Sequence, residues 1–384
     1  MPENPSQTTV AIAMSGGVDS SVAAALLRAE GFRVFGIMLR LWTEPGKEAE
    51  NRCCTLEAVD LARHIARQLD ISFHLIDARD AFRDTVVQYF LDGYTTGITP
   101  NPCLRCNRRI RWGLMWEHAR ALGADFLATG HYARLRHCPE GGLRLLRGID
   151  DHKDQSYVLS RLTREQLRHT LLPIGDYTKS EVRLLAQEFH LPVANRPDSQ
   201  DLCFLAGGDY RDFLQRYAPQ SKRPGPILDR DGKQLGTHRG LAFYTIGQRK
   251  GLGIAADRPL YVLEKDANRN ALIVGPREAL GHNTLQAAQA NWIAPPPADA
   301  FRAAVQIRAT AKPQPATVTV LPDARFQVVF DTLQRDITPG QAAAIYRGEQ
   351  CLGSGIITAA ADTSALAKHG EIASGYADCT EEHG

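Results

Sequence analysis

The chain has 384 residues, of which 43% are hydrophobic and 23% charged, and its formal net charge is +2. This length favours two or three domains, and the composition is typical of a globular protein rather than a disordered one. No apolar run approaches the ~20 residues of a membrane span, and the polar first residues, 1–9, carry no basic segment of a signal peptide. We therefore expect a cytoplasmic protein without a membrane partner, in which a nucleic acid would be bound by local basic clusters.

The first third of the chain alternates strand and helix patterns. The predicted strands are residues 9–14, 34–39, 71–76 and 126–129, and the predicted helices are 21–29, 56–69, 81–92 and 111–122. Such alternation indicates an α/β domain with a mostly parallel sheet covered by helices on both faces. Ligands of such sheets bind at the carboxyl ends of the strands, so residues 14–21 and 128–132 are expected to meet there.

A glycine loop joins the first strand to the first helix. Its sequence, Met-Ser-Gly-Gly-Val-Asp-Ser-Ser at residues 14–21, can bring backbone N–H groups and a helix N-terminus to a phosphate. The carboxylate of Asp19 suits a Mg²⁺ ion that binds the phosphate, while Ser15, Ser20 and Ser21 offer hydroxyl donors and helix-capping oxygens. The loop lacks the Gly-Lys-Ser/Thr ending of a Walker A motif. An ordinary glycine turn before a helix is the simpler alternative.

A Cys-x-x-Cys pair, Cys103 and Cys106, follows two prolines in the segment 99–109. The prolines delay a helix until about residue 103, so the cysteines lie at a helix start. There the helix dipole and four nearby arginines are expected to lower the pKa of a thiol. Half of a zinc site is an alternative, although no second Cys or His pair follows at short spacing. A thioredoxin-type redox pair does not account for the glycine loop.

Beyond the first third, helical patterns at 164–171 and 179–189 precede a polar loop, 196–205, that contains Cys203. In such a loop Cys203 is either accessible or a packing cysteine. Short strands with turn residues follow from about residue 218, including a hairpin turn at 231–232 and a basic glycine-rich loop at 247–253. After three prolines at 295–297, alternating segments between 301 and 358 suggest a small β-barrel or sandwich.

Six motifs in this order resemble the bacterial tRNA-specific 2-thiouridylase (MnmA) family of the ATP-pyrophosphatase (PP-loop) superfamily. They are the glycine loop, Asn-Pro-x-x-x-Cys-Asn at 101–107, Ala-Thr-Gly-His-Tyr at 128–132, Lys-Asp-Gln-Ser-Tyr at 153–157, Cys-Phe at 203–204 and Gly-Gln-Arg-Lys-Gly-Leu-Gly at 247–253. The resemblance implies a HUP-like, PP-loop adenylation domain at 1–215, a small β-rich central domain at 216–288, a tRNA-contacting β-barrel at 289–360 and a mobile tail at 361–384. It implies ATP-dependent 2-thiolation of the wobble uridine in tRNAs for Lys, Glu and Gln.

Carried over by position, the resemblance also implies the site residues. The ATP contacts would be Ala13, Met14, Ser15, Gly16, Gly17, Val18, Asp19, Ser20, Leu39 and Gly130. The tRNA contacts would be Asn101, Pro102, Cys103, His131, Lys153, Asp154, Gln155, Arg308, Ala309 and Gln341, of which the first three would face the target base. Cys106 and Cys203 match the catalytic cysteines.

Two chemical routes remain open at the sulfur step. In the persulfide route Cys203 carries a sulfur from a cysteine desulfurase or relay protein, and Cys106 then forms a disulfide with Cys203. In the other route Cys103, Cys106 and Cys203 hold an iron–sulfur cluster, since many family members have Asp at the position of Cys103. ATP and Mg²⁺ are the other expected cofactors, and we expect a monomer. The rival functions are a small-molecule ATP-pyrophosphatase, which explains the loop but not the cysteines, and a zinc-holding RNA-binding module.

Overall fold

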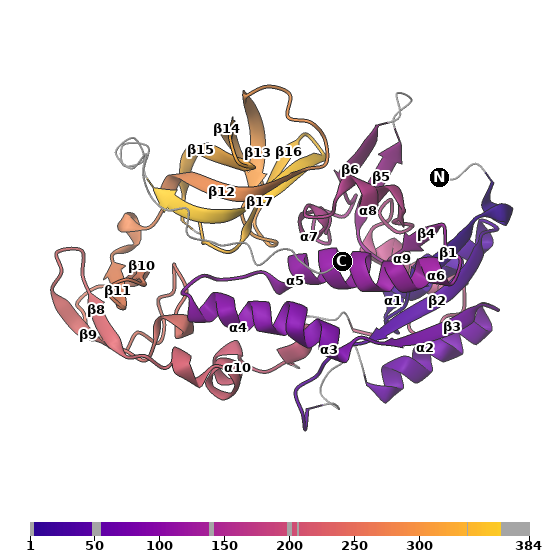
Figure 1. Cartoon of the computed structure of the whole chain (residues 1–384), viewed down its shortest axis with the longest axis horizontal. Helices are drawn as coiled ribbons and strands as arrows, with labels where there is room; N and C mark the ends of the chain where they lie inside the picture. Colours follow the sequence, from indigo (N-terminus) through magenta and orange to yellow (C-terminus); the bar gives the residue numbers. More distant parts are fainter. Residues whose placement is uncertain are drawn as a thin grey trace, which may run out of the picture.

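The computed structural model describes residues 4–47, 55–137, 142–197, 202–205, 207–335 and 337–361. Of the expected tail at 361–384, residue 361 is the last residue of a strand, and residues 362–384 lie outside the described residues. Figure 1 shows the parallel sheet with its helices at one end of the molecule, and the β-barrel and the small central sheet toward the other. Within the described ranges, no helix is both long and apolar enough to cross a bilayer.

The first sheet is parallel, with strand order β3-β2-β1-β4-β7. Its strands are β1 (Thr9–Ala13), β2 (Arg33–Arg40), β3 (Ser72–Asp77), β4 (Phe126–Ala128) and β7 (Thr170–Leu171). Alternate residues of β1 enter different cores, since Val10 and Ile12 belong to one buried cluster and Ala11 to another. The predicted α/β sheet is confirmed.

Helices cover the sheet on both faces. α1 (Val18–Ala29), α2 (Leu56–Gln68) and α9 (Lys179–Glu188) contribute to the cluster that contains Val10. The helices on the other face contain π-helical segments, η2 (Arg83–Val87) between α3 (Arg79–Phe82) and α4 (Gln88–Thr95), and η3 (Cys106–Met115) between α5 (Pro102–Arg105) and α6 (Trp116–Ala121). Segments of π-helix often mark functional positions, and η3 begins at a predicted catalytic cysteine.

Three of the predicted helix bounds were wrong. α1 begins three residues before the predicted start. The helix predicted from residue 111 is continuous with the one expected at about residue 103, which begins at Pro102, because Asn101 Oδ1 accepts hydrogen bonds from the Cys103 and Leu104 N–H groups and proline suits the first helical position. The helix predicted to reach residue 171 ends at Arg168 in α8 (Arg164–Arg168), since Thr170 enters the sheet as β7 and accepts a hydrogen bond from Trp112 Nε1 at 2.6 Å.

The central domain is a small sheet with strand order β10-β11-β8-β9. Its strands are β8 (Gly225–Leu228), β9 (Gln234–His238), β10 (Tyr261–Asp266) and β11 (Ala271–Gly275). α10 (Tyr210–Tyr217) precedes it and packs through Phe213 against Trp42 and Phe90 of the first domain. The predicted hairpin at 231–232 joins β8 to β9.

The barrel closes through the pairing of β12 with β17. Its strands are β12 (His282–Trp292), β13 (Ala300–Gln306), β14 (Gln314–Leu321), β15 (Arg325–Gln334), β16 (Ala342–Arg347) and β17 (Gln350–Ala361). Because β12 begins at residue 282, it crosses the boundary expected after residue 288, and the prolines at 295–297 lie between β12 and β13.

The barrel is joined to the first domain by strand pairing and by buried polar contacts. The hairpin of β5 (Ala133–His137) and β6 (Leu143–Arg147) extends the barrel sheet, because β6 pairs with β17. In α7 (Ser156–Leu159), the Tyr157 hydroxyl lies 3.1 Å from both the N–H and the C=O of Ala342. These contacts fix the barrel beside the loops that follow the parallel strands.

Candidate active site

A cavity of about 320 Å³ lies at the carboxyl ends of the parallel strands. The residues predicted to bind ATP that line it are Ala13, Met14, Ser15, Gly17, Val18, Asp19, Ser20, Leu39 and Gly130. The remaining one, Gly16, supports the loop: its φ is +68°, and an added Cβ would lie 2.7 Å from the Ala58 carbonyl oxygen. The loop after β1 and the loop after β4 thus meet at one edge of the sheet, as the sequence predicted.

Hydrogen bonds within the glycine loop hold its shape. The Ser15 N–H donates to Ser20 Oγ at 3.2 Å, and the Ser20 and Ser21 hydroxyls donate to the Gly17 carbonyl at 3.3 and 2.7 Å. The capping role expected of these serines was wrong, because the N-cap residue of α1 is Gly17 and no side chain caps it. The N–H groups of the first turn are therefore available for an anion in the cavity.

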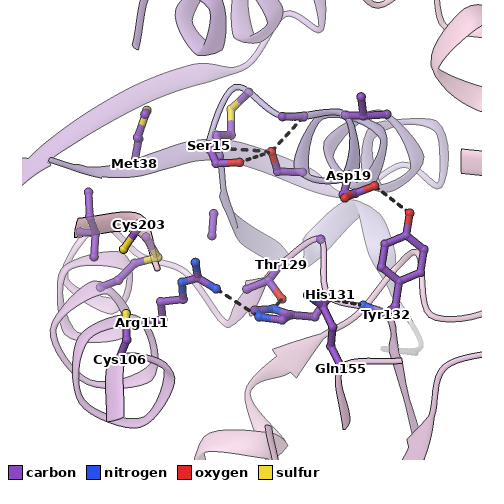
Figure 2. Close-up of a pocket in the computed structure, with 18 of the residues that line it drawn as sticks. Ser15, Asp19, Met38, Cys106, Arg111, Thr129, His131, Tyr132, Gln155 and Cys203 are labelled. Carbon is purple, nitrogen blue, oxygen red and sulfur yellow. Dashed lines mark hydrogen bonds between the residues drawn. The ribbon is translucent and has the colours of Figure 1, made fainter. Parts of the chain in front are cut away.

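Asp19 is contacted by two side chains that the sequence prediction missed. The Tyr132 hydroxyl donates to Asp19 Oδ1 at 2.7 Å (Figure 2), and Lys179 Nζ lies 2.7 Å from the same oxygen. Lys179 is the first residue of α9, whose N-cap Thr178 forms a capping box with Glu181. A lysine is unfavourable in the first turn of a helix, because its charge opposes the helix dipole. This unusual position is the sequence signal by which Lys179 could have been found.

The donor set at Asp19 fits a single Mg²⁺ held together with phosphate oxygens. Mg²⁺ in nucleotide sites commonly takes one or two carboxylates plus substrate phosphates, and Asp19 supplies one carboxylate. Both observed contacts of that carboxylate fall on Oδ1. Within the described residues, no group of three or more His, Cys, Asp or Glu side chains is arranged to hold a metal by itself.

Cys106 and Cys203 line the same cavity as the glycine loop. Cys106 is the first residue of η3, and Cys203 begins a short 3-10 turn, η4 (Cys203–Leu205). In Figure 2 both cysteines lie across the cavity from Ser15 and Asp19, with Arg111 near them. The two predicted catalytic cysteines, 97 positions apart, are thus brought to one chamber.

Cys103 does not join them. It is exposed, does not line the cavity and forms no three-cysteine ligand set with Cys106 and Cys203 in the described part of the chain, so this arrangement does not fit the expected cluster. The expectation of a lowered thiol pKa was wrong for Cys103. Part of the Cys103 side chain is exposed to solvent, but the protein atoms packed around it desolvate the thiol. This desolvation raises the thiol pKa by more than the charge of Arg111 lowers it.

His131 is a buried, neutral histidine at the cavity wall. Burial lowers its pKa well below the ordinary value, and Arg111 lowers it further. Arg111 Nη1 lies 3.1 Å from Nε2, and because a guanidinium only donates, Nε2 is the acceptor and Nδ1 carries the proton. Nδ1 lies 2.7 Å from the Thr129 hydroxyl. The pair thus presents a fixed positive charge, on Arg111, beside the cysteines.

The other residues predicted to contact tRNA lie in two places. Lys153 and Gln155 line the cavity with His131, whereas Asn101 Nδ2 lies 3.3 Å from Gln341 Oε1 at the contact with the barrel. Pro102 is buried at the start of α5, and Arg308 donates to the Thr338 hydroxyl at 2.8 Å, next to Ala309.

Asp154 has an internal role in the structure. Its carboxylate accepts hydrogen bonds from the Arg147 guanidinium and from the Gly148 and Ser156 N–H groups. Arg196, which no motif singled out, donates to the Gly16 carbonyl at 2.6 Å and lines the cavity.

Comparison with known proteins assigns all three domains. Residues 8–207 match the family profile described as "tRNA methyl transferase HUP domain", 211–276 its "PRC-barrel domain" and 282–357 the "Aminomethyltransferase beta-barrel domain". The proteins named tRNA-specific 2-thiouridylase MnmA from Moorella thermoacetica and Geotalea uraniireducens are 50% and 46% identical to it, over 91% and 96% of this chain and 99% and 100% of their own. With such identity over nearly the whole length, the chain belongs to the tRNA-specific 2-thiouridylase (MnmA) family.

Proposed function

We propose that this enzyme uses ATP to replace the carbon-2 oxygen of the wobble uridine by sulfur in tRNAs for Lys, Glu and Gln. The observation that carries the proposal is the single cavity lined by both the glycine loop and the two distant cysteines, Cys106 and Cys203. A phosphate-binding loop alone would suit a small-molecule synthetase, but such an enzyme does not require two cysteines beside the loop. The names of the relatives support the same activity.

Adenylation is the first step. The uridine carbonyl oxygen attacks the α-phosphorus of ATP, pyrophosphate leaves, and the oxygen becomes part of AMP, a good leaving group. The uncapped first turn of α1 and the cations of Lys179 and Arg196 would stabilise the pyrophosphate. Asp19 would hold Mg²⁺, which supplies further charge compensation when bound.

Sulfur transfer is the second step. The terminal sulfur of a Cys203 persulfide attacks carbon 2, and AMP leaves with the former carbonyl oxygen. The Cys106 thiolate then attacks the Cys203 sulfur, 2-thiouridine departs, and a Cys106–Cys203 disulfide remains for reduction by a cellular thiol. The guanidinium of Arg111 lies where it would favour the anionic sulfur.

For tRNA binding we propose that Asn101, Pro102 and Cys103 face the target base. His131, Lys153, Gln155, Arg308, Ala309 and Gln341 would contact the anticodon arm, while Asp154 would shape the loop that carries Lys153. The target base has to be turned out of the anticodon loop to reach the cavity. The sulfur would come from a cysteine desulfurase or a relay protein. A monomer in the cytoplasm remains our expectation.

The test is thiolation of tRNA by three cysteine variants, with iron measured after anaerobic purification. On the persulfide route, Cys106→Ser and Cys203→Ser abolish 2-thiouridine formation while tRNA-dependent pyrophosphate release continues, and Cys103→Ser stays active without iron. On the alternative route, which requires Cys103 to move to the other two cysteines, Cys103→Ser loses both iron and thiolation. Thiolation that survives in Cys106→Ser and Cys203→Ser would contradict both routes.

A further inference from the structure

Four arginines form a cluster at the junction of the first domain and the barrel, and none of them is part of the site described above. Arg105, Arg108 and Arg109 lie within about one helical turn of each other and flank Cys106. Arg161 follows α7, is buried and donates from Nη1 to the carbonyl oxygens of Gln289 and Ser354 in the barrel at 2.5 and 3.0 Å. We call these four residues the arginine cluster.

The arginine cluster has no acidic counterpart. In the part of the chain that the structure describes, none of its members forms an ion pair, whereas other exposed arginines such as Arg79 and Arg302 do. Burial lowers the pKa of Arg108, and the charges of Arg109 and Arg105 lower it further. Burial is also the main reason that the pKa of Arg161 is lowered to about 10, and the charge of Arg108 adds to the effect. The charges therefore lie close enough to repel each other without compensation.

The side chains are nevertheless held in place. The Arg105 guanidinium lies over the Tyr89 ring, 5.1 Å from its centroid, and its Nε donates to the Thr85 carbonyl oxygen at 3.3 Å. Arg161 is fixed by its two carbonyl contacts. Uncompensated guanidinium groups that are positioned in advance suit an anion with several oxygens, because each planar group can donate two parallel hydrogen bonds.

We propose that the arginine cluster, through its exposed members Arg105 and Arg109, binds phosphates of the RNA backbone on either side of the base that enters the cavity. This inference rests on the proposed function. Three members of the cluster lie on the helix that carries Cys106 and begins after Asn101, which contacts Gln341 of the barrel, and Arg161 contacts the barrel directly. A base turned into the cavity brings its flanking phosphates to this edge. RNA is favoured over an acidic sulfur-donor protein because backbone phosphates carry their charge at each nucleotide and match guanidinium geometry.

The test is the salt dependence of tRNA binding by the double variant Arg105→Gln/Arg109→Gln, which changes only exposed members of the cluster. The matched control is Arg63→Gln, an exposed arginine on α2 that pairs with Asp60. Each single-strand phosphate that an arginine neutralises contributes about 0.7 to the slope of log affinity against log salt, so the slope should fall by about 1.4 in the double variant. If the double variant and the wild type bind equally at about 1 M salt, affinity at 0.1 M salt should then be roughly 25-fold lower in the variant. Arg63→Gln should match the wild type, and ATP binding should be unchanged in all three proteins.

An unchanged slope and affinity in the double variant would overturn the inference and leave the proposed function intact. So would a variant that keeps its tRNA affinity but no longer accepts sulfur from a protein donor, since the cluster would then be a protein-binding surface. If the wild type binds tRNA but does not thiolate it, the proposed function fails, and the salt slope still decides the role of the cluster. Loss of ATP binding in the double variant would also overturn the inference, since these arginines would then support the fold and not the RNA.

Discussion

Gly130 is the point at which the loop after β4 touches the helix that carries the phosphate-binding loop. A Cβ at this position would lie 2.7 Å from the Asp19 carbonyl carbon and 2.7 Å from the Ser20 nitrogen, where ordinary contacts begin at 3.4 Å. Both are backbone atoms, so no side-chain rotation relieves the overlap. In Gly130→Ala, α1 and the loop after β4 must separate by several tenths of an ångström.

Overpacking of this kind costs about 1–3 kcal/mol of folding free energy. The displaced parts are the glycine loop and the Asp19 carboxylate, so the effect on catalysis should be larger than the effect on folding. A misplacement approaching 1 Å can lower a rate by about 10²-fold, and we expect tRNA-dependent AMP formation to fall by at least about tenfold.

The assay compares Gly130→Ala with Gly113→Ala. At Gly113 a Cβ would lie 3.6 Å from the Arg108 carbonyl oxygen, an ordinary contact, and the residue is within η3, so alanine should be neutral or stabilise by about 0.4–1 kcal/mol. AMP release, ATP affinity by calorimetry and denaturant unfolding are measured for both. If Gly130→Ala keeps wild-type ATP affinity and wild-type AMP formation, the close contact between the two loops does not position the glycine loop and Asp19, and the reasoning is refuted.

Three further predictions concern single side chains. Below the ordinary histidine pKa of 6.5, His131 is protonated in the unfolded chain but stays neutral in the folded protein, so the free energy of unfolding should fall as the pH drops below 6.5. His131→Gln should flatten that part of a pH–stability curve measured by urea unfolding. Thr178→Ala and Thr163→Ala each remove a helix cap and should each lower the free energy of unfolding by about 1 kcal/mol. Only Thr178→Ala should also weaken ATP binding, because Thr178 precedes Lys179. Equal ATP affinities in the two variants would contradict this. Cys351 is fully buried and its thiol pKa is raised to about 12 by burial, so mass spectrometry should find it unmodified by iodoacetamide at pH 8 until the protein unfolds, and rapid labelling of the native protein would count against its burial.

Local sequence patterns predicted most of the α/β domain. The apolar runs and amphipathic segments of β1, β2 and α2 lie within a few residues of their predicted bounds, because burial on one face leaves a direct periodic signal. β7 has two residues and carries no such signal; Thr170 is placed by its bond to Trp112, a contact between distant segments. The order of the domains and the site residues came from the resemblance of the six motifs to a family, because periodicity carries no information about either.

The site was predicted only where residues belonged to a motif. Asp19, Cys106 and Cys203 line one cavity, as their assigned roles require. Lys179 and Arg196 were missed, since an isolated basic residue gives no indication of the loop it will reach across the fold. The direction of the Cys103 pKa shift was also wrong, because desolvation depends on the packed structure and not on the neighbouring residues in the sequence.

The central claim is that one cavity couples ATP cleavage to sulfur transfer onto tRNA. The most direct measurement is a single-turnover reaction of persulfide-loaded enzyme with unmodified tRNA for Glu, in which AMP and 2-thiouridine are quantified together by mass spectrometry. We predict that the two products appear in equal amounts, that neither forms without its co-substrate, and that a Cys106–Cys203 disulfide accumulates in step with them. AMP release that needs no tRNA, or thiouridine formed without AMP, would contradict the account.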